Sequence, residues 1–150
     1  MPQSLVKNYI HIVFSTKYRQ PFITKKIENA LYAYIGAMCN DMDCPPIKIG
    51  GHLNHVHILC LLSRKVALMD LLEEIKAHSS KWMKTNGPEF TNFYWQDGYA
   101  AFSVSSKEVD KVILYIEHQH EHHETIKFQD EMRAIFVQTK TKFDERYCWD

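Results

Sequence analysis

The sequence predicts an α+β protein that forms one domain over residues 1–150. Three observations favour this fold class. First, segments with alternating apolar residues are separated by two segments with apolar residues at helical spacing. Second, two of the strand-like segments are close enough along the chain to pair as a hairpin. Third, 45% of the 150 residues are hydrophobic. A chain of this size and composition can bury one sizeable core. We therefore expect an antiparallel sheet with helices packed on it.

The chain begins with a predicted strand followed by a predicted helix. Residues 9–17 alternate and are rich in β-branched and aromatic side chains, as is typical of a strand. Residues 24–41 carry apolar side chains at helical spacing, with Thr24 as the expected N-cap. The helix should end before Pro45 and Pro46, because proline cannot continue it.

A hairpin and a second helix follow. Residues 47–49 are expected to pair with a strand at residues 55–62, and the glycines at positions 50 and 51 predict the turn between them. Residues 66–85 carry leucines and isoleucine on one helical face, and Asn86-Gly87-Pro88 ends that helix.

The last part of the chain adds one strand and two helices. Residues 93–104 are aromatic and partly alternating, which indicates a final strand, whereas residues 107–124 and 128–138 show helical spacing. The order β-α-β-β-α-β is that of a ferredoxin-like fold, an antiparallel sheet with helices on one face. The C-terminal helices then follow the sheet.

Two histidines on the predicted central strand form a candidate metal site. His55 and His57 flank Val56, and alternate side chains of a strand point to the same face of a sheet. Neutral imidazole is a common metal ligand, so a pair on a rigid strand needs only one or two further donors to bind a divalent cation. Because the chain has nine histidines, this spacing can also arise by chance.

A tyrosine and a glutamine lie one turn apart on the helix predicted over residues 107–124. At roughly 100° per residue, Tyr115, Gln119 and His122 fall in one narrow sector beside the apolar stripe of this helix. A tyrosine at the edge of a core with its hydroxyl in water, next to a solvated glutamine, is the simpler interpretation of this pair alone.

Together these segments resemble a known family. His55-Val56-His57 has the form His-hydrophobic-His, and Tyr115 followed by Gln119 has the form of a nucleophile helix. With residues 11–19, 95–104 and 122–131, they resemble the single-tyrosine HUH transposases of small bacterial insertion sequences, especially the REP-associated tyrosine transposases. The resemblance covers nearly the whole chain. His118 departs from it, since asparagine is expected there.

The resemblance implies an enzyme that cuts and rejoins DNA. Tyr115 would attack a phosphodiester, forming a 5′-phosphotyrosine link and releasing a 3′ hydroxyl. His55, His57 and Gln119 would hold Mg²⁺ or Mn²⁺, although ligand softness alone leaves Zn²⁺ open. The implied partner is single-stranded DNA that contains hairpins. A homodimer is also implied, and the sequence leaves open whether Tyr115 serves its own chain or, in trans, the other subunit.

Net charge gives no support for a nucleic-acid partner, because 18 basic residues balance 18 acidic ones. A local basic patch would suffice for phosphate contacts. The candidate DNA contacts are Lys17, Arg19, Arg64 and Lys65 near strand ends, and Trp82 as a base-stacking residue on the second helix.

The chain shows no sign of secretion or of a membrane span. It lacks a long apolar run and a charged-then-apolar N-terminus, so we expect a cytosolic protein, and the resemblance implies the bacterial cytoplasm. Its four cysteines have no CxxC spacing, which argues against a zinc ribbon or a disulfide framework.

Two interpretations compete with the strand transferase. One is a ferredoxin-like nucleic-acid-binding module without catalytic activity, and the other is a metal-dependent phosphoesterase that uses His55 and His57 to activate water. The histidines at positions 118, 120, 122 and 123 are expected to form a solvated helix end, and only His122 is a candidate auxiliary acid or base.

Overall fold

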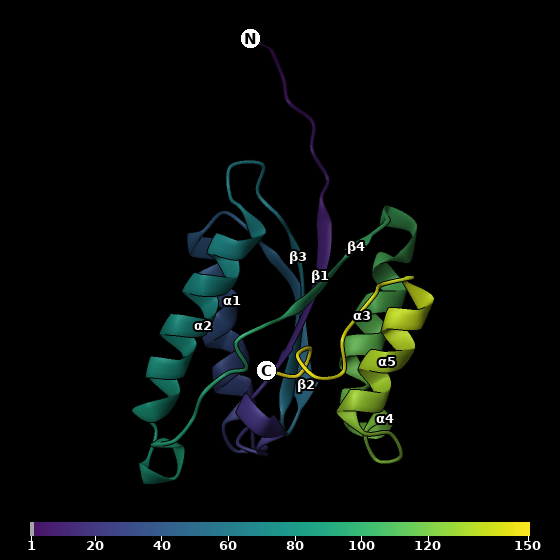
Figure 1. Ribbon diagram of the computed structural model, residues 1–150. Helices are drawn as coiled ribbons and strands as arrows, with labels where there is room; N and C mark the ends of the chain where they lie inside the picture. Colours follow the sequence, from purple (N-terminus) through teal and green to yellow (C-terminus); the bar gives the residue numbers. More distant parts are fainter. Residues whose placement is uncertain (1) are drawn as a thin grey trace.

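The structure, a computed structural model, describes residues 2–150 and has three layers (Figure 1). The strands are β1 (Tyr9–Ser15), β2 (Pro46–His52), β3 (His55–Leu61) and β4 (Ala100–Val104). The helices are α1 (Glu28–Asp41), α2 (Leu68–Lys84), α3 (Val109–Glu117), α4 (Gln119–His122) and α5 (Phe128–Gln138). Short 3₁₀ turns occur at Lys17–Arg19, Pro88–Phe90 and Ser106–Glu108.

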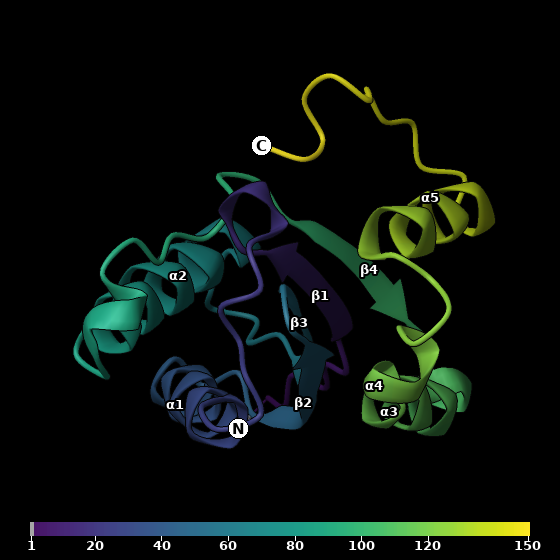
Figure 2. The same ribbon diagram turned by 90° about the horizontal axis from the view of Figure 1, so that it is seen from below.

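The middle layer is an antiparallel sheet with strand order β2-β3-β1-β4. Helices α1 and α2 cover one face of this sheet, and α3, α4 and α5 lie on the other, as the view from below shows (Figure 2). The predicted α+β fold with additional C-terminal helices is therefore confirmed. No helix within residues 2–150 is long and apolar enough to cross a bilayer.

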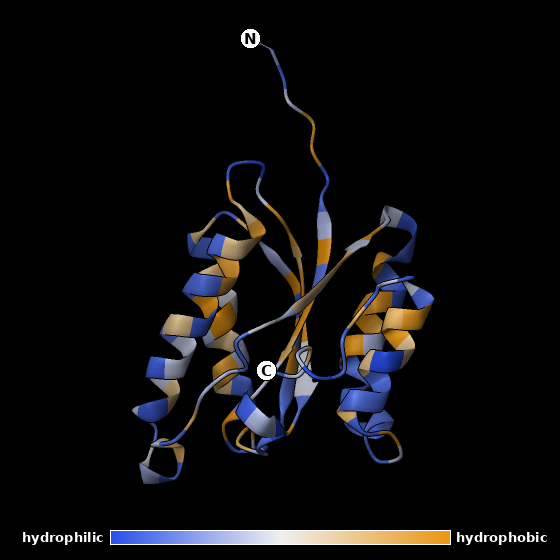
Figure 3. Ribbon diagram, viewed as in Figure 1, coloured by the Kyte–Doolittle hydropathy of each residue, from blue (hydrophilic) through white to orange (hydrophobic). Residues whose placement is uncertain are grey.

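The larger core fills the space between the sheet and helices α1 and α2. Ile12, Phe14 and Ile58 point into it and are fully buried, and the leucines and isoleucines of both helices close it from the other side. Figure 3 shows hydrophobic residues along the central strands and on α1 and α2, whereas α4 is mostly hydrophilic. Alternation along β1 and β3 then turns their histidines toward the opposite layer.

The hairpin turn lies at residues 53–54, and the prediction of a turn at Gly50 and Gly51 was wrong. Both glycines belong to β2, where Gly50 pairs with His57 and Gly51 with Val56. A side chain at Gly51 would collide with the backbone of residue 55. These glycines therefore let neighbouring backbone approach β2 closely and do not form a turn.

Gly50→Ala is expected to lower the stability of the protein by about 1–3 kcal/mol, the usual cost of overpacking. An added Cβ would lie 2.8 Å from Cγ2 and 2.9 Å from the carbonyl oxygen of Ile116, so α3 would have to move away from β2. Urea denaturation measures the change. Gly36→Ala is the matched control, because a Cβ there meets its nearest atom at an ordinary 3.6 Å. Equal stability of the two variants would contradict this close packing.

Two predicted segments begin later than expected. Helix α1 starts at Glu28, and its N-cap is Ile27 rather than Thr24. The backbone carbonyl oxygen of Thr24 accepts hydrogen bonds from the amides of Ile27 and Glu28. The extended segment from residue 93 joins the sheet as β4 only at Ala100; before it, Trp95 makes an isolated bridge with Thr16.

The loop before β4 is held by a lysine instead of by strand pairing. Lys76 Nζ donates to the carbonyl oxygens of Gln96, Asp97 and Gly98, at 2.9, 3.1 and 2.5 Å. Burial lowers the pKa of this lysine to about 8, against the opposing charge of Asp97. Hydrogen bonds from the Lys76 side chain to the backbone of residues 96–98 therefore replace the strand pairing that the alternating pattern predicted there.

The helix predicted over residues 107–124 is interrupted. A 3₁₀ turn at Ser106–Glu108 leads into α3, which ends at Glu117, and α4 begins at Gln119. His118 lies between them with φ −99° and ψ 23°, outside helical geometry. The break thus lies one residue before Gln119.

Candidate functional site

Three histidines from neighbouring strands form the floor of the site. His55 and His57 on β3 and His11 on β1 lie on the face covered by α3, α4 and α5, and all three are buried. His57 Nδ1 and His11 Nε2 are 2.8 Å apart, and His55 Nδ1 donates to Asn54 Oδ1 at 2.9 Å. These contacts orient the imidazoles of His55 and His57, whose Nε2 atoms both lie near Glu131 Oε1.

Tyr115 and Gln119 close the site from α3 and α4. The Tyr115 ring is edge-on to His57, with centroids 5.5 Å apart, and Gln119 Oε1 lies 2.9 Å from His55 Nε2. Gln119 is 1% exposed, so the solvated glutamine of the simpler interpretation is not found. The sequence-predicted residues His55, His57, Tyr115 and Gln119 are thus brought together within one chain.

Glu131 on α5 is a site residue that the sequence analysis missed. Its side chain is 3.4 Å from His57 Nε2 and 3.5 Å from His55 Nε2, and it accepts hydrogen bonds from the Tyr115 hydroxyl and from Gln119 Nε2. The available signal was its place between Phe128 and Met132, because a carboxylate beside the apolar stripe of a helix needs polar partners.

The donor atoms of this cluster fit a divalent cation. His55 Nδ1 donates to an amide oxygen, so neutral His55 presents the lone pair of Nε2 to Gln119 Oε1, which is also an acceptor. His57 Nε2 is buried without a hydrogen-bond partner among residues 2–150. Acceptors that face one another with no proton between them repel, and a cation among them would remove that repulsion. His55, His57 and Glu131 offer ligand atoms within 4.8 Å of one another.

Burial and neighbouring charges shift the pKa values of the site in consistent directions. Desolvation, with the charge of His57 next, lowers the pKa of His55 well below 6.5. Burial and the carboxylate of Glu131 raise the pKa of Tyr115 above its usual value. Burial alone would raise the pKa of Glu131, but the hydrogen bond from His123 and the neighbouring imidazoles of His57 and His55 hold that pKa well below its usual range. Glu131 is therefore ionised at neutral pH, whereas Tyr115 and His55 are uncharged.

The metal-free protein is expected to lose stability as pH falls from about 6.5 toward 3. Burial, and then the charge of His57, lowers the pKa of His11 from 6.5 to about 3, so between these values the unfolded chain takes up a proton that the folded chain does not. Each such group contributes at most about 1.4 kcal/mol per pH unit.

Urea denaturation in chelator, at about pH 7 and about pH 5.5, measures this loss. The loss should be smaller in His11→Asn and unchanged in His78→Asn, whose histidine is exposed on α2. An equal loss in His11→Asn would show that His11 is not buried in its neutral form.

The C-terminal histidines are only partly solvated, so that prediction was wrong for two of the four. His118 is exposed, but the His123 side chain is 3% exposed and its Nε2 lies 3.1 Å from Glu131 Oε1. His122 Nε2 is buried 3.4 Å from Glu131 Oε2. His120 pairs with Glu28 on α1 at 2.8 Å. Helix α5 covers this end of the cluster, and the periodicity of the earlier helix could not reveal that.

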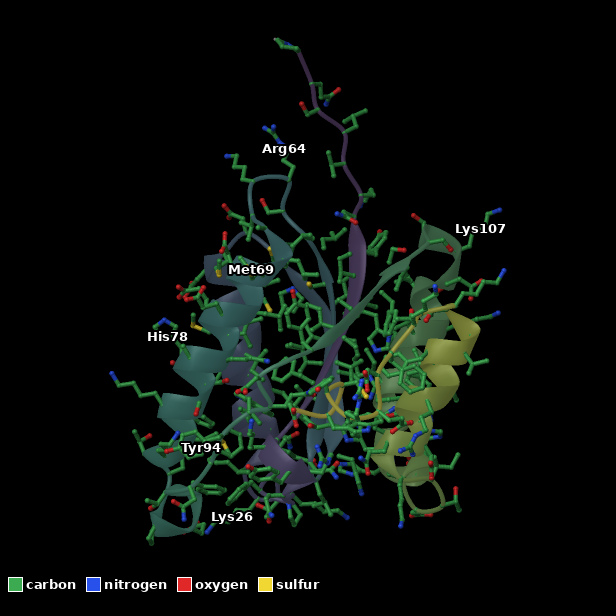
Figure 4. The ribbon with its side chains drawn as sticks, in the orientation of Figure 1. Lys26, Arg64, Met69, His78, Tyr94 and Lys107 are labelled. Atoms are coloured by element: carbon green, nitrogen blue, oxygen red, sulfur yellow. The ribbon has the colours of Figure 1, made fainter. Side chains whose placement is uncertain are left out.

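The five candidate DNA contacts lie in three different places. Lys17 and Arg19 follow β1 at the end of the sheet where Ser15 pairs with His55. Arg64 and Lys65 follow the opposite end of β3, about 20 Å along the strand, and Figure 4 labels Arg64 at that far end. Trp82 stacks on Tyr34 between α1 and α2, across the sheet from the site.

Two of these basic groups are already engaged within the chain. Lys17 pairs with Asp97 at 3.2 Å, and Arg19 Nη1 donates to the carbonyl oxygen of Trp149 at 2.9 Å. The pair of Lys17 and Asp97 is exposed, and exposed ion pairs are weak enough to exchange for a phosphate, whereas the bond from Arg19 to Trp149 is part-buried.

A hollow of about 630 Å³ reaches the tyrosine from outside. It lies between β4, α3 and α5 and is lined in part by His11, Ser105, Tyr115 and Gln138. A second hollow of about 460 Å³ lies at the hairpin end, next to Arg19, His123 and Lys127. The site is therefore buried at its floor and approachable from two sides.

The fold is found in two solved structures of transposases. One, from Deinococcus radiodurans R1 and assigned as a transposase, aligns with a TM-score of 0.62 and 18% identity over 79% of this chain and 96% of its own. The other, a REP-associated tyrosine transposase bound to a REP hairpin, aligns with a TM-score of 0.60 and 15% identity over 84% of this chain and 74% of its own. No curated protein matches the chain.

The fold is one that transposases share, and the site is a buried cluster of histidines, a glutamine and a carboxylate beside a tyrosine. The family model described as "Transposase IS200 like" matches residues 4–119, which is most of the chain. The protein belongs to the IS200-like transposase family. The resemblance seen in the sequence is thereby confirmed.

Proposed function

We propose that this protein cuts and rejoins single-stranded DNA with Tyr115 as its nucleophile. Family membership supports DNA transposition as the process. The observation that carries the proposal is the contact of the Tyr115 hydroxyl with Glu131, whose carboxylate lies against the imidazoles of His55 and His57. A water-using phosphoesterase or an inactive binding module has no need of a tyrosine at that position.

The reaction exchanges one phosphoester bond for another. The oxygen of Tyr115 bonds to phosphorus while the bond from phosphorus to the 3′ oxygen breaks, the tyrosine loses its proton and the departing 3′ oxygen gains one. The product is a 5′-phosphotyrosine link and a free 3′ hydroxyl. Because the new link is also a phosphodiester, a second 3′ hydroxyl can attack it and restore the DNA strand without a nucleotide cofactor.

Tyr115 needs help to react, because its raised pKa keeps the hydroxyl protonated at neutral pH. The surrounding residues orient it: Glu131 accepts its hydrogen bond, and His57 and His11 pack edge-on against its ring. Such positioning lowers the entropic part of the barrier.

We further propose that His55, His57 and Gln119 hold Mg²⁺ or Mn²⁺. A bound divalent cation would neutralise charge on the scissile phosphate in the transition state. The facing acceptor atoms of His55 and Gln119 and the unpartnered Nε2 of His57 support this ligand set.

We propose a hairpin-containing single strand as the substrate, as in the neighbour bound to a REP hairpin. Lys17 and Arg19 are the candidate phosphate contacts best supported by position, because they lie at the His55 end of the sheet. Arg64 and Lys65 remain candidates only for DNA that extends to the far end, and Trp82 only for DNA that wraps around to α2. The role of His122 as an auxiliary acid or base also remains a prediction.

The proposed nucleophile serves its own chain. Tyr115 contacts His57 and Glu131 of the same molecule, which supports a site built in cis. The homodimer remains a prediction, and a cis site would function in a dimer or a monomer.

The test incubates the full-length protein with a pool of single-stranded hairpin oligonucleotides and Mn²⁺, followed by a denaturing gel. A DNA–protein adduct that disappears in chelator supports the strand transferase. Cleavage without an adduct would instead indicate a phosphoesterase, and DNA binding without cleavage would indicate the inactive binding module.

A further inference from the structure

Glu131 is a buried carboxylate that belongs neither to the His-hydrophobic-His motif nor to the pair of Tyr115 and Gln119. It is 3% exposed, and within residues 2–150 its ion-pair partners are histidines, with no lysine or arginine among them. Burying a carboxylate without a compensating positive charge costs several kcal/mol. A cation bound to Glu131 would offset this cost.

The two oxygens of Glu131 face different groups. Oε1 faces the histidine side, 3.5 Å from His55 Nε2 and 3.4 Å from His57 Nε2. Oε2 faces the tyrosine side, where it accepts hydrogen bonds from Tyr115 and, at 3.0 Å, from Gln119 Nε2. One carboxylate thus joins the two halves of the site.

The spacing around Oε1 suits metal coordination better than hydrogen bonding. Ligand atoms in adjacent octahedral positions around a cation about 2.1 Å away are about 3 Å apart, close to the two distances from Oε1 to the imidazoles. Both distances are long for a charge-assisted hydrogen bond, for which about 2.8 Å is usual.

A neighbouring histidine also contacts Oε1. His123 Nδ1 donates to the carbonyl oxygen of Ile126 at 2.5 Å, and His123 Nε2 lies 3.1 Å from Glu131 Oε1. These two contacts fix the position of Oε1 beside the imidazoles of His55 and His57.

We propose that Glu131 binds the divalent cation through Oε1 while Oε2 holds the hydroxyl of Tyr115, so that one carboxylate links the cation to the nucleophile. The inference rests on the cation site of the proposed function and adds to it a ligand from α5. The carboxylate oxygen of Glu131 is a hard, negatively charged ligand. With it, the site suits Mg²⁺ and Mn²⁺ better than a site made only of the two imidazoles and the Gln119 amide. Cation binding would then fix α5 against the sheet and set the position of Tyr115.

The test measures Mn²⁺ affinity of the full chain by electron paramagnetic resonance, without DNA. Glu131→Gln keeps the shape of the side chain, and we expect it to weaken Mn²⁺ binding about 10- to 100-fold. Glu121→Gln, an exposed glutamate on α4, is the matched control and should bind as the wild type does. Circular dichroism and thermal melting of each variant show whether it is folded, and Glu131→Asp, which retains the charge, should recover part of the affinity.

A second measurement tests the link to the nucleophile. With 3-fluorotyrosine at position 115, Mg²⁺ should shift the fluorine resonance in the wild type and leave it nearly unchanged in Glu131→Gln at a saturating Mg²⁺ concentration. If Mg²⁺ shifts it equally in both proteins, Glu131 does not link cation and tyrosine.

The outcomes separate this inference from the proposed function. Wild-type affinity in Glu131→Gln, together with lost affinity in His57→Ala, would overturn the role of Glu131 and leave the histidine site intact. A wild-type protein that binds no Mn²⁺ would overturn both this inference and the cation site of the proposed function.

Discussion

Tyr115→Phe is expected to abolish the covalent DNA–protein adduct and to slow strand cleavage by at least about 10³-fold. The substitution removes the single oxygen that would bond to phosphorus and leaves the ring in place against His57 and His11. It also removes the hydrogen bond to Glu131, but the carboxylate keeps Gln119 as a donor. The adduct and the cleaved strand are measured on one denaturing gel.

The matched control is Tyr147→Phe, since Tyr147 is 64% exposed and lies outside the site. It should react as the wild type does. DNA binding by Tyr115→Phe, measured by mobility shift, should be nearly unchanged, because the chemistry and not the surface is altered. An adduct that persists in Tyr115→Phe would mean that another residue is the nucleophile.

His57→Ala is expected to weaken Mn²⁺ binding and to reduce cleavage, each by about 10²-fold or more. The reason is the position of His57 at the centre of the cluster, where its unpartnered Nε2 faces Glu131 and its Nδ1 contacts His11. Calorimetric titration with Mn²⁺ measures the first effect. His78→Ala on α2 is the control and should change neither quantity.

A mixture of His57→Ala and Tyr115→Phe chains tests whether the site is shared between subunits. Because Tyr115 contacts His57 of its own chain, the mixture should stay inactive. Recovered activity would show that the tyrosine acts in trans. Subunit exchange, followed by labelled chains, is the necessary control.

The sequence predicted the two parts of the site that depend on local geometry. His55 and His57 share a face because strand residues alternate, and Tyr115 and Gln119 are neighbours because they are one helical turn apart. The resemblance to the family gave these four residues their expected roles. Strands β1 and β3 and helices α1 and α2 followed from periodicity in the same way, with ends that differ by a few residues, whereas β4 is much shorter than the strand predicted over residues 93–104.

The sequence could not predict contacts that depend on neighbours distant along the chain. Glycines at positions 50 and 51 looked like a turn, yet they lie in β2 because the backbones of α3 and β3 approach too closely for a side chain. His123 looked solvated because the element that covers it, α5, begins only at Phe128.

What the sequence by itself determined is the family, the order of elements and the residues that share a strand face or a helix turn, since each of these follows from identity and spacing along the chain. What only the tertiary structure decided is the closure of the site. Glu131 reaches His55, His57 and Tyr115 because α5 folds back over the sheet. That packing depends on the shapes of three layers at once, and no periodicity within one segment encodes it.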